Sequence, residues 1–325
     1  MKPAGIGRVW RGEASDEPSS SAGAGFDAPN PAREDARPTE SSKMYHFRSV
    51  IVIFLTATLS GNVARAELKT NIEYGRAGNQ ALLLDANVPE GTGPFPVVIA
   101  IHGGGWCTGD KSGKGDFAPA LKALTANHFT WFSIDYRLAP TNRWPDCLDD
   151  VQAAIRWVKA HAAEYKGDPD RIALLGYSAG GQLACLAATL ARPDTRVQAV
   201  VGLAPPTDLA ADAQHRGSLK KWPAMRNLLG RDSLDDETLK LLRQLSPINH
   251  VKPGLPPFLL MQGDSDKTVL PAFTRNFAVK LKENHVPCDL YFLKGAGHRI
   301  ADWEKFDPAY PEKLTNWLNQ TLVIR

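Results

Sequence analysis

The sequence predicts an α/β fold, with a mostly parallel sheet of about eight strands and helices on both faces. From residue 95 onward, short apolar runs alternate with longer segments of helical periodicity. Some runs, such as FPVVIAI at 95–101, are apolar throughout, which is typical of a strand buried on both faces. Polar or glycine-rich clusters follow several strands, and functional groups gather at that edge of a parallel sheet.

The elements are expected in a regular order after an antiparallel pair formed by TNIEYG and ALLLDANV, joined by a Gly-Asn turn. Strands are then expected at 95–101, 129–136, 171–177, 197–204, 256–263 and 288–295. Helices are expected at 116–128, 145–165, 179–191, 271–285 and near 308–320. Residues 205–250 interrupt this alternation with two helical stretches, SLKKWPAMRNLLG and SLDDETLKLLRQL, and are expected to form a small cap, with Asp208 as a helix N-cap.

The first 66 residues differ from the rest. Residues 1–43 are rich in Pro, Gly, Ser, Ala and charge, a composition typical of disorder. Residues 44–66 have the pattern of a secretory signal peptide, with Arg48, an apolar run from Val50 to Leu59, and an A-x-A site ending at Ala66. We therefore expect export to the periplasm or the exterior, with cleavage after Ala66. Residues 1–43 are then a disordered leader or an over-extended reading frame before Met44, and 67–325 form one catalytic domain.

Composition narrows the classes of partner. A net charge of +3, with no basic run that interleaves aromatics, argues against nucleic acid. No apolar stretch reaches the roughly 18 residues of a membrane span. The four cysteines form no CxxC pair, and no metal or cofactor is expected. Cys185 is expected to be buried, and pairing of Cys107 with Cys147 stays open.

The stretch GYSAG, from Gly176 to Gly180, matches G-x-S-x-G at the junction of a buried strand and a helix. This context is typical of a nucleophile elbow, in which a strained turn projects a serine hydroxyl above the sheet. The two glycines let neighbouring backbone pass closely. Ser178 is therefore the candidate nucleophile.

A serine nucleophile needs a base, held by a third group, and the elbow predicts the order serine, acid, histidine. GDSD at 263–266 follows one late strand, and GAGH at 295–298 follows the last. His298 is the expected base. Asp266 is preferred over Asp264 as the acid because loops of this type place the acid three residues after the strand-terminal glycine; Asp264 is then a turn-forming residue.

The stretch HGGGW, from His102 to Trp106, follows the third strand. A phosphate-binding loop would need a helix directly after the glycines and a G-K-[ST] ending, and neither is present. An HGGG-type loop instead supplies backbone N–H groups to an oxyanion hole, together with the residue after the nucleophile, Ala179.

These motifs, together with DYRLAP at 135–140 and GDPDRIALLGYSAGGQLA at 167–184, give the chain its resemblance to a family. It resembles α/β-hydrolase carboxylesterases related to the hormone-sensitive-lipase family. Two features are closer to the secreted feruloyl/acetyl-esterase-like group. The residue before the serine is Tyr177, where hormone-sensitive-lipase relatives have Asp, and the segment before strand 95–101 is short. The resemblance implies a catalytic triad of Ser178, Asp266 and His298, and an oxyanion hole formed by the amides of Gly103, Gly104 and Ala179.

The expected reaction is hydrolysis of short-chain acyl, acetyl or feruloyl-type esters, small or polysaccharide-linked, through an acyl-enzyme. Trp106 and Tyr177 are expected in the substrate pocket. A serine peptidase or amidase of the same fold is the alternative, because a triad does not choose between ester and amide. A non-catalytic binding protein is a third possibility, disfavoured by the complete set of catalytic motifs.

Overall fold

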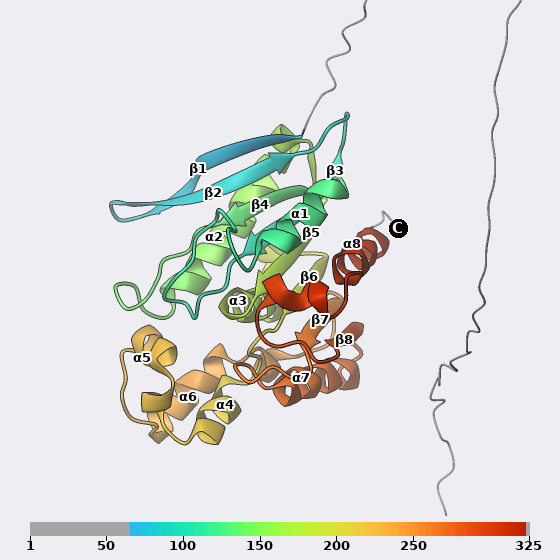
Figure 1. Cartoon of the computed structure of the whole chain (residues 1–325). Coiled ribbons are helices and arrows are strands. Elements are labelled where there is room, and N and C mark those ends of the chain that lie inside the picture. The colour runs from blue at the N-terminus through green and yellow to red at the C-terminus, as the bar shows by residue number, and fades with distance from the viewer. Residues whose placement is uncertain (1–65, 323–325) are drawn as a thin grey trace, which may run out of the picture. The chain divides into compact units, whose positions relative to one another are not determined.

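The computed structural model describes residues 66–322 (Figure 1). The predictions for residues 1–43, and for the signal peptide up to Arg65, lie outside the described residues. The described part contains an eight-stranded sheet with the strand order β1-β2-β4-β3-β5-β6-β7-β8. Its strands are β1 (Glu67–Ala77), β2 (Gln80–Val88), β3 (Phe95–Ile101), β4 (Thr130–Ile134), β5 (Gly167–Tyr177), β6 (Ala199–Leu203), β7 (Phe258–Gly263) and β8 (Cys288–Leu293).

The sheet is antiparallel at one end and parallel elsewhere. β2 pairs antiparallel with both β1 and β4, whereas β4, β3, β5, β6, β7 and β8 run parallel to one another. Gly78 turns the first hairpin with φ of +59°, a conformation that glycine adopts without strain. The expected antiparallel pair and the parallel sheet are thus confirmed.

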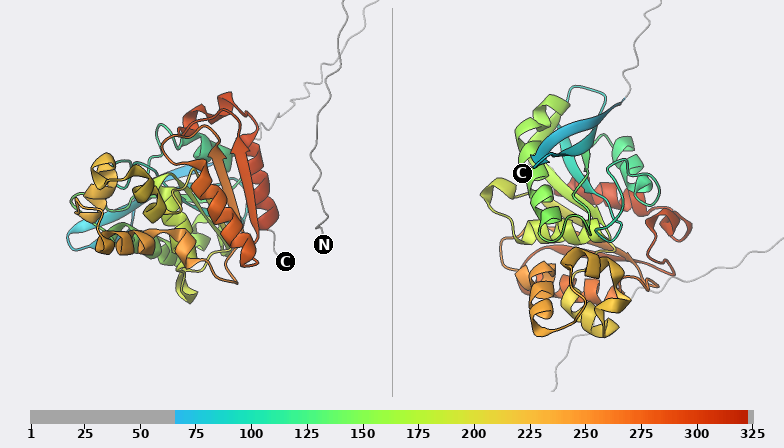
Figure 2. Two further views of the ribbon diagram at one scale, coloured as in Figure 1. Left: turned by 90° about the horizontal axis from the view of Figure 1, so that it is seen from below. Right: turned by 90° about the vertical axis from the view of Figure 1, so that its left-hand side faces the viewer.

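Helices cover both faces of the sheet (Figures 1 and 2). Alternate residues of β3 belong to different core clusters: Val97, Ile99 and Ile101 to one, Val98 and Ala100 to the other. This is the expected strand with two buried faces. The first cluster includes apolar side chains of α2 (Asp146–His161), α3 (Ala179–Thr189) and α7 (Pro271–Glu283); the second includes those of α1 (Ala118–Ala126) and α8 (Tyr310–Thr321).

The segment 205–250 forms a helical cap between β6 and β7, grouped at one end of the domain in Figure 1. It contains three α-helices, where the sequence predicted two. The additional helix, α4 (Leu209–Arg216), is only eight residues long, and Asp208 caps it by accepting the N–H of Ala211 at 3.0 Å, as predicted. The other two are α5 (Pro223–Leu229) and α6 (Asp236–Leu245).

Short 3₁₀ turns complete the fold: Ala162–Tyr165, which ends the predicted helix 145–165, Pro193–Thr195, Leu219–Lys221, Pro247–His250 and Ile300–Lys305. All four cysteines are free thiols, so the structure contains no bridge between Cys107 and Cys147, and Cys185 is buried as expected. Within residues 66–322, no helix combines the length and apolar character needed to cross a membrane.

Candidate active site

Ser178 lies in a strained turn between β5 and α3. Its φ of 52° and ψ of −118° are unfavourable for a side chain with a Cβ. The flanking glycines make the turn possible: a Cβ on Gly176 would lie 2.1 Å from the carbonyl oxygen of Gly180, and one on Gly180 would lie 2.2 Å from that of Ile101. The tight turn therefore requires glycine on both sides of the serine and places its hydroxyl at the carboxyl edge of the sheet.

The hydroxyl of Ser178 lies within hydrogen-bonding distance of a histidine–aspartate pair. His298 Nε2 is 2.9 Å from Ser178 Oγ, and His298 Nδ1 is 2.8 Å from Asp266 Oδ2. A carboxylate only accepts, so Nδ1–H donates to Asp266 and leaves Nε2 as the acceptor of the serine proton. The structure thus brings together Ser178, Asp266 and His298 from three separate loops.

The carboxylate of Asp266 is buried, and both of its oxygens accept hydrogen bonds. Oδ1 accepts the backbone N–H groups of Thr268 at 2.8 Å and Val269 at 2.9 Å. Oδ2 accepts His298 and the side-chain amide of Gln262, which is 3.1 Å away. Gln262 is not among the site residues expected from the sequence. The one hint of its role is that a polar residue stands inside the apolar strand β7, four residues before Asp266.

Asp264 has a different role. Its Oδ1 accepts the N–H of Gly295 at 2.7 Å, which joins the loop after β7 to the loop after β8. The side chain of Asp264 is exposed, whereas that of Asp266 is buried. The structure therefore brings Asp266 to His298 and uses Asp264 to hold the two loops together.

Each of the three glycines in the loop after β3 is closely surrounded. A Cβ on Gly103 would lie 2.8 Å from the ring of Tyr177, and one on Gly104, where φ is +109°, would lie 2.1 Å from Thr108 O. Gly105 also has a positive φ, of +59°. Side chains at these positions would meet the Tyr177 ring, the Thr108 backbone or Ala224, so the loop could not keep its present course.

Two of the expected oxyanion residues line the same pocket as Ser178. They are Gly104 and Ala179, whereas Gly103 is not among the lining residues and lies against Tyr177. Ala179 is the first residue of α3, so its N–H has no partner within the helix. This amide and the glycine loop provide backbone donors beside the serine.

His102 holds the start of this loop. Its Nδ1 donates to Gly103 O at 2.7 Å, and its ring stacks on Tyr136 with centroids 4.3 Å apart. The Tyr136 hydroxyl donates in turn to His102 O at 3.1 Å. Burial lowers the pKa of His102. Both residues stand in the motifs HGGGW and DYRLAP, but nothing in those motifs indicated that the two side chains would contact each other.

The pocket at Ser178 has a volume of about 440 Å³. Trp106 and Tyr177 both line it, and the Tyr177 hydroxyl donates to His298 O at 3.2 Å. The cap contributes Arg216, whose guanidinium lies 4.6 Å from the ring centroid of Trp222. The cap also contributes Lys221, Trp222, Pro223 and Ala224 to the lining. The pocket is therefore shared between the sheet edge and the cap.

A scan against protein-family models matches residues 84–281 to the family described as BD-FAE. This match spans more than half of the chain. The chain belongs to the BD-FAE family. The matched region contains Ser178, Asp266 and the glycine loop, and it ends before His298, which the structure adds to the site.

Curated relatives of this family member are named as esterases. "Probable carboxylic ester hydrolase LipM" of Mycobacterium tuberculosis is 35% identical over 226 residues, which cover 65% of this chain and 50% of the relative. "Esterase LipC" of the same organism is 32% identical over 219 residues, covering 64% and 53%. The chain thus spans about half the length of these relatives.

Solved structures show the α/β-hydrolase fold of the family. A truncated carbohydrate esterase from gut microbiota aligns with a TM-score of 0.67 at 24% identity, covering 80% of this chain and 98% of that one. A thermophilic esterase from Thermogutta terrifontis aligns with a TM-score of 0.61 at 26% identity, covering 79% and 91%. The chain accordingly has this fold.

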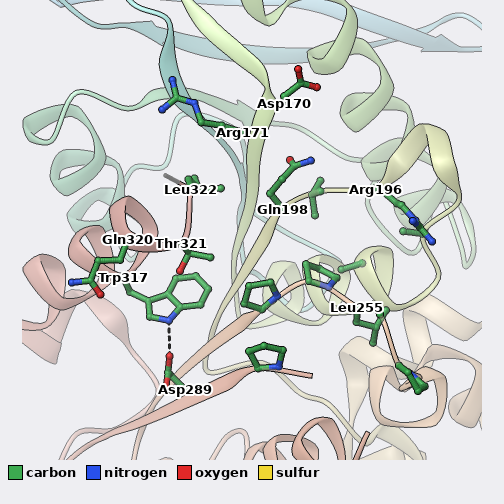
Figure 3. Close-up of a pocket in the computed structure, with 18 of the residues that line it drawn as sticks. Asp170, Arg171, Arg196, Gln198, Leu255, Asp289, Trp317, Gln320, Thr321 and Leu322 are labelled. Atoms are coloured by element: carbon green, nitrogen blue, oxygen red, sulfur yellow. Dashed lines mark hydrogen bonds between the residues drawn. The ribbon is translucent and has the colours of Figure 1, made fainter. Parts of the chain in front are cut away.

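A second hollow, of about 1060 Å³, lies at the opposite, amino-terminal edge of the parallel strands (Figure 3). It is bordered by the start of β5, the segments that precede β6 and β7, and the end of α8, where the indole N–H of Trp317 donates to Asp289 at 2.7 Å. Its lining contains no serine, cysteine or histidine. Among residues 66–322 there is also no cluster of three or more His, Cys, Asp or Glu side chains suited to a metal.

Proposed function

We propose that this protein is a serine hydrolase that cleaves carboxylic esters through an acyl-enzyme. The observation that carries the proposal is the hydrogen-bonded series Ser178–His298–Asp266, which opens into a pocket beside a glycine loop. The esterase names of the relatives support the same reaction.

The geometry suits each step of the reaction. His298 Nε2 takes the proton of Ser178 as Oγ attacks the ester carbonyl, and it returns this proton to the departing alkoxide. A water molecule, activated by the same nitrogen, then releases the acid and regenerates the serine. Asp266 keeps Nδ1 protonated and stabilises the imidazolium, and its four hydrogen-bond donors keep the carboxylate in place.

Backbone amides stabilise the charge that develops on the carbonyl oxygen. We assign this role to Ala179 and Gly104, which line the pocket beside Ser178, and the family resemblance adds the amide of Gly103. Each donor in such a site contributes on the order of 3 kcal/mol to the transition state. The donors are pre-oriented, because the elbow and the glycine loop are both held by close backbone packing.

The pocket fits a short or planar acyl group. Its volume of about 440 Å³ and its aromatic walls, Trp106, Tyr177 and Trp222, suit acetyl, short-chain acyl or feruloyl-type esters. The Thermogutta terrifontis esterase, 26% identical, has a structure titled as butyrate-bound. We propose small-molecule or polysaccharide-linked esters of these acids as substrates.

The test is Ser178→Ala assayed with p-nitrophenyl esters of increasing acyl length, methyl ferulate and acetylated xylan, beside matched anilides. Hydrolysis should be almost abolished in the variant while its thermal unfolding stays close to that of the wild type. An organophosphonate should label the wild type at Ser178 and leave the variant unlabelled. An unchanged rate in the variant would refute the serine mechanism, and faster cleavage of the anilides would favour an amidase.

We also propose export with cleavage after Ala66. The supporting observations are the signal-peptide pattern of residues 44–66 and the start of β1 at Glu67, so that cleavage there leaves the hairpin complete. The N-terminal sequence of the native secreted protein tests this proposal. A mature chain that keeps residues 1–43 would contradict it.

A further inference from the structure

The side-chain amide of Gln182 joins three parts of the site. Gln182 lies in α3, one turn after the nucleophile, and is 1% exposed. Its Oε1 accepts the indole N–H of Trp106 at 2.9 Å, and its Nε2 donates to Leu245 O at 2.8 Å. Its backbone N–H donates to Ser178 O at 3.0 Å. One residue thus contacts the oxyanion loop, the nucleophile and the cap.

Trp106 is the residue that directly follows the three glycines. It is 2% exposed and has a φ of +59°, which is uncommon for a residue with a large side chain. Its carbonyl accepts the N–H of Ala139 at 2.9 Å. The loop therefore ends in a strained, buried residue whose only side-chain polar group is held by Gln182.

Leu245 is the last residue of α6, so the second bond of Gln182 reaches the cap. The cap also contacts the loop directly: a Cβ on Gly105 would lie 3.0 Å from the Cβ of Ala224, at the start of α5. The thiol of Cys107 points to Ala224 O at 3.7 Å. The third glycine thus lies where α5 of the cap packs closely on the loop, and Gln182 joins the same loop to α6 of the cap.

We infer that Gln182 is a positioning residue that couples the cap to the oxyanion loop. This inference rests on the proposed function. A buried amide left without a partner costs free energy, so both of its bonds favour one arrangement of loop and cap. In that arrangement Trp106 is fixed, and with it the peptide groups of Gly103 and Gly104. A cap that is displaced would loosen the oxyanion donors while the serine and histidine stay in place.

The test compares Gln182→Met, Trp106→Phe and the double variant with Gln198→Met, a control for the same substitution at an exposed position. Methionine keeps the length of the side chain and removes both hydrogen bonds. Gln198 also bonds through its amide oxygen, to the N–H of Ile172 at 2.9 Å, but lies near the amino-terminal edge of the sheet. Each variant is assayed for kcat and KM, for thermal unfolding, and for inhibition by a boronic acid that forms a tetrahedral anionic adduct with Ser178.

Gln182→Met should lower kcat by about 10-fold with KM changed less than about twofold, because the lost contact acts in the transition state. Affinity for the boronic acid should fall in parallel. Trp106→Phe should also lower kcat and the boronate affinity. The double variant should lose no more activity than the more impaired of the two single variants, because the bond between Trp106 and Gln182 is already lost in each of them. Gln198→Met should leave kcat and the boronate affinity unchanged.

Several outcomes would overturn the inference. These are an unchanged kcat in Gln182→Met, a loss of thermal stability alone, or losses that add fully in the double variant. If Gln182→Met does not fold, Trp106→Phe decides by the same criteria. A failure of the proposed function is distinguishable, because it would show in the wild type as absent ester hydrolysis and absent phosphonate labelling.

Discussion

Replacing Asp266 with Asn should nearly abolish turnover, whereas the same change at Asp264 should not. The geometry determines how an asparagine must sit at position 266. The N–H groups of Thr268 and Val269 point at Oδ1 from 2.8 and 2.9 Å and need an acceptor there. The amide nitrogen of the substituted side chain is therefore forced into the place of Oδ2, facing His298 Nδ1 and the amide of Gln262.

A donor at that place reverses the histidine tautomer. His298 Nδ1 must then accept, the proton moves to Nε2, and the serine loses its base. Loss of the correct tautomer costs about 10⁴-fold in kcat, which corresponds to about 5.4 kcal/mol of transition-state stabilisation. At position 264 an asparagine keeps an acceptor for Gly295 N–H, so only the contribution of charge is lost, about 1 kcal/mol of stability or less.

The assay is kcat for p-nitrophenyl acetate, with thermal unfolding of both variants as the measure of folding. Asp264→Asn is the matched control, because it removes one negative charge from the same loop. If Asp266→Asn keeps more than about a tenth of the activity, or if Asp264→Asn loses as much, the assignment of the acid is wrong.

Two further changes test the packing of the elbow and of the glycine loop. Gly180→Ala should prevent folding or destabilise the protein severely, because its Cβ would lie 2.2 Å from Ile101 O. Gly75→Ala should be tolerated, because its Cβ would meet only Leu82, at an ordinary 3.7 Å. Soluble yield and urea denaturation of the two variants test this difference. Burial lowers the pKa of His102, so the unfolded chain binds a proton near pH 6.5 that the folded protein does not. The contribution of neutral His102 to the free energy of unfolding is therefore complete above about pH 6.5. It is lost as the pH falls toward the lower pKa of the folded protein, and the unfolding free energy then drops by no more than about 1.4 kcal/mol per pH unit. His102→Asn, which keeps a donor for Gly103 O, should flatten the decline of unfolding free energy between pH 7 and 5, and an equal decline in both proteins would contradict this origin.

The order of elements could be read from the sequence because each parallel strand is an apolar run, and several of these runs are closed by a glycine or polar cluster. The position of the site followed from the same pattern. Parallel strands end at one edge, so residues that come directly after β3, β5, β7 and β8 meet in space even though they are far apart in the chain. The need for glycine at 176 and 180 was also visible, since a strained serine turn leaves no room for side chains.

Other features depended on contacts between distant segments. The sequence favoured Asp266 over Asp264 only by its distance from the strand-terminal glycine, whereas the contacts separate the two: Asp266 Oδ2 lies 2.8 Å from His298 Nδ1, and Asp264 Oδ1 accepts the N–H of Gly295. The short helix α4 has a mixed composition, and packing in the cap stabilises it more than its own periodicity does.

The sequence by itself determined the sheet, the strained turn at Ser178 and the chain order of Ser178, Asp266 and His298, because these depend on local periodicity and on strand ends that converge. Only the tertiary structure decided that Gln182 joins Trp106 to Leu245, and that the third glycine of the loop lies against the cap. The sequence around a buried glutamine is the same whichever groups its side chain bonds to. Its partners therefore follow from the packing of the whole domain.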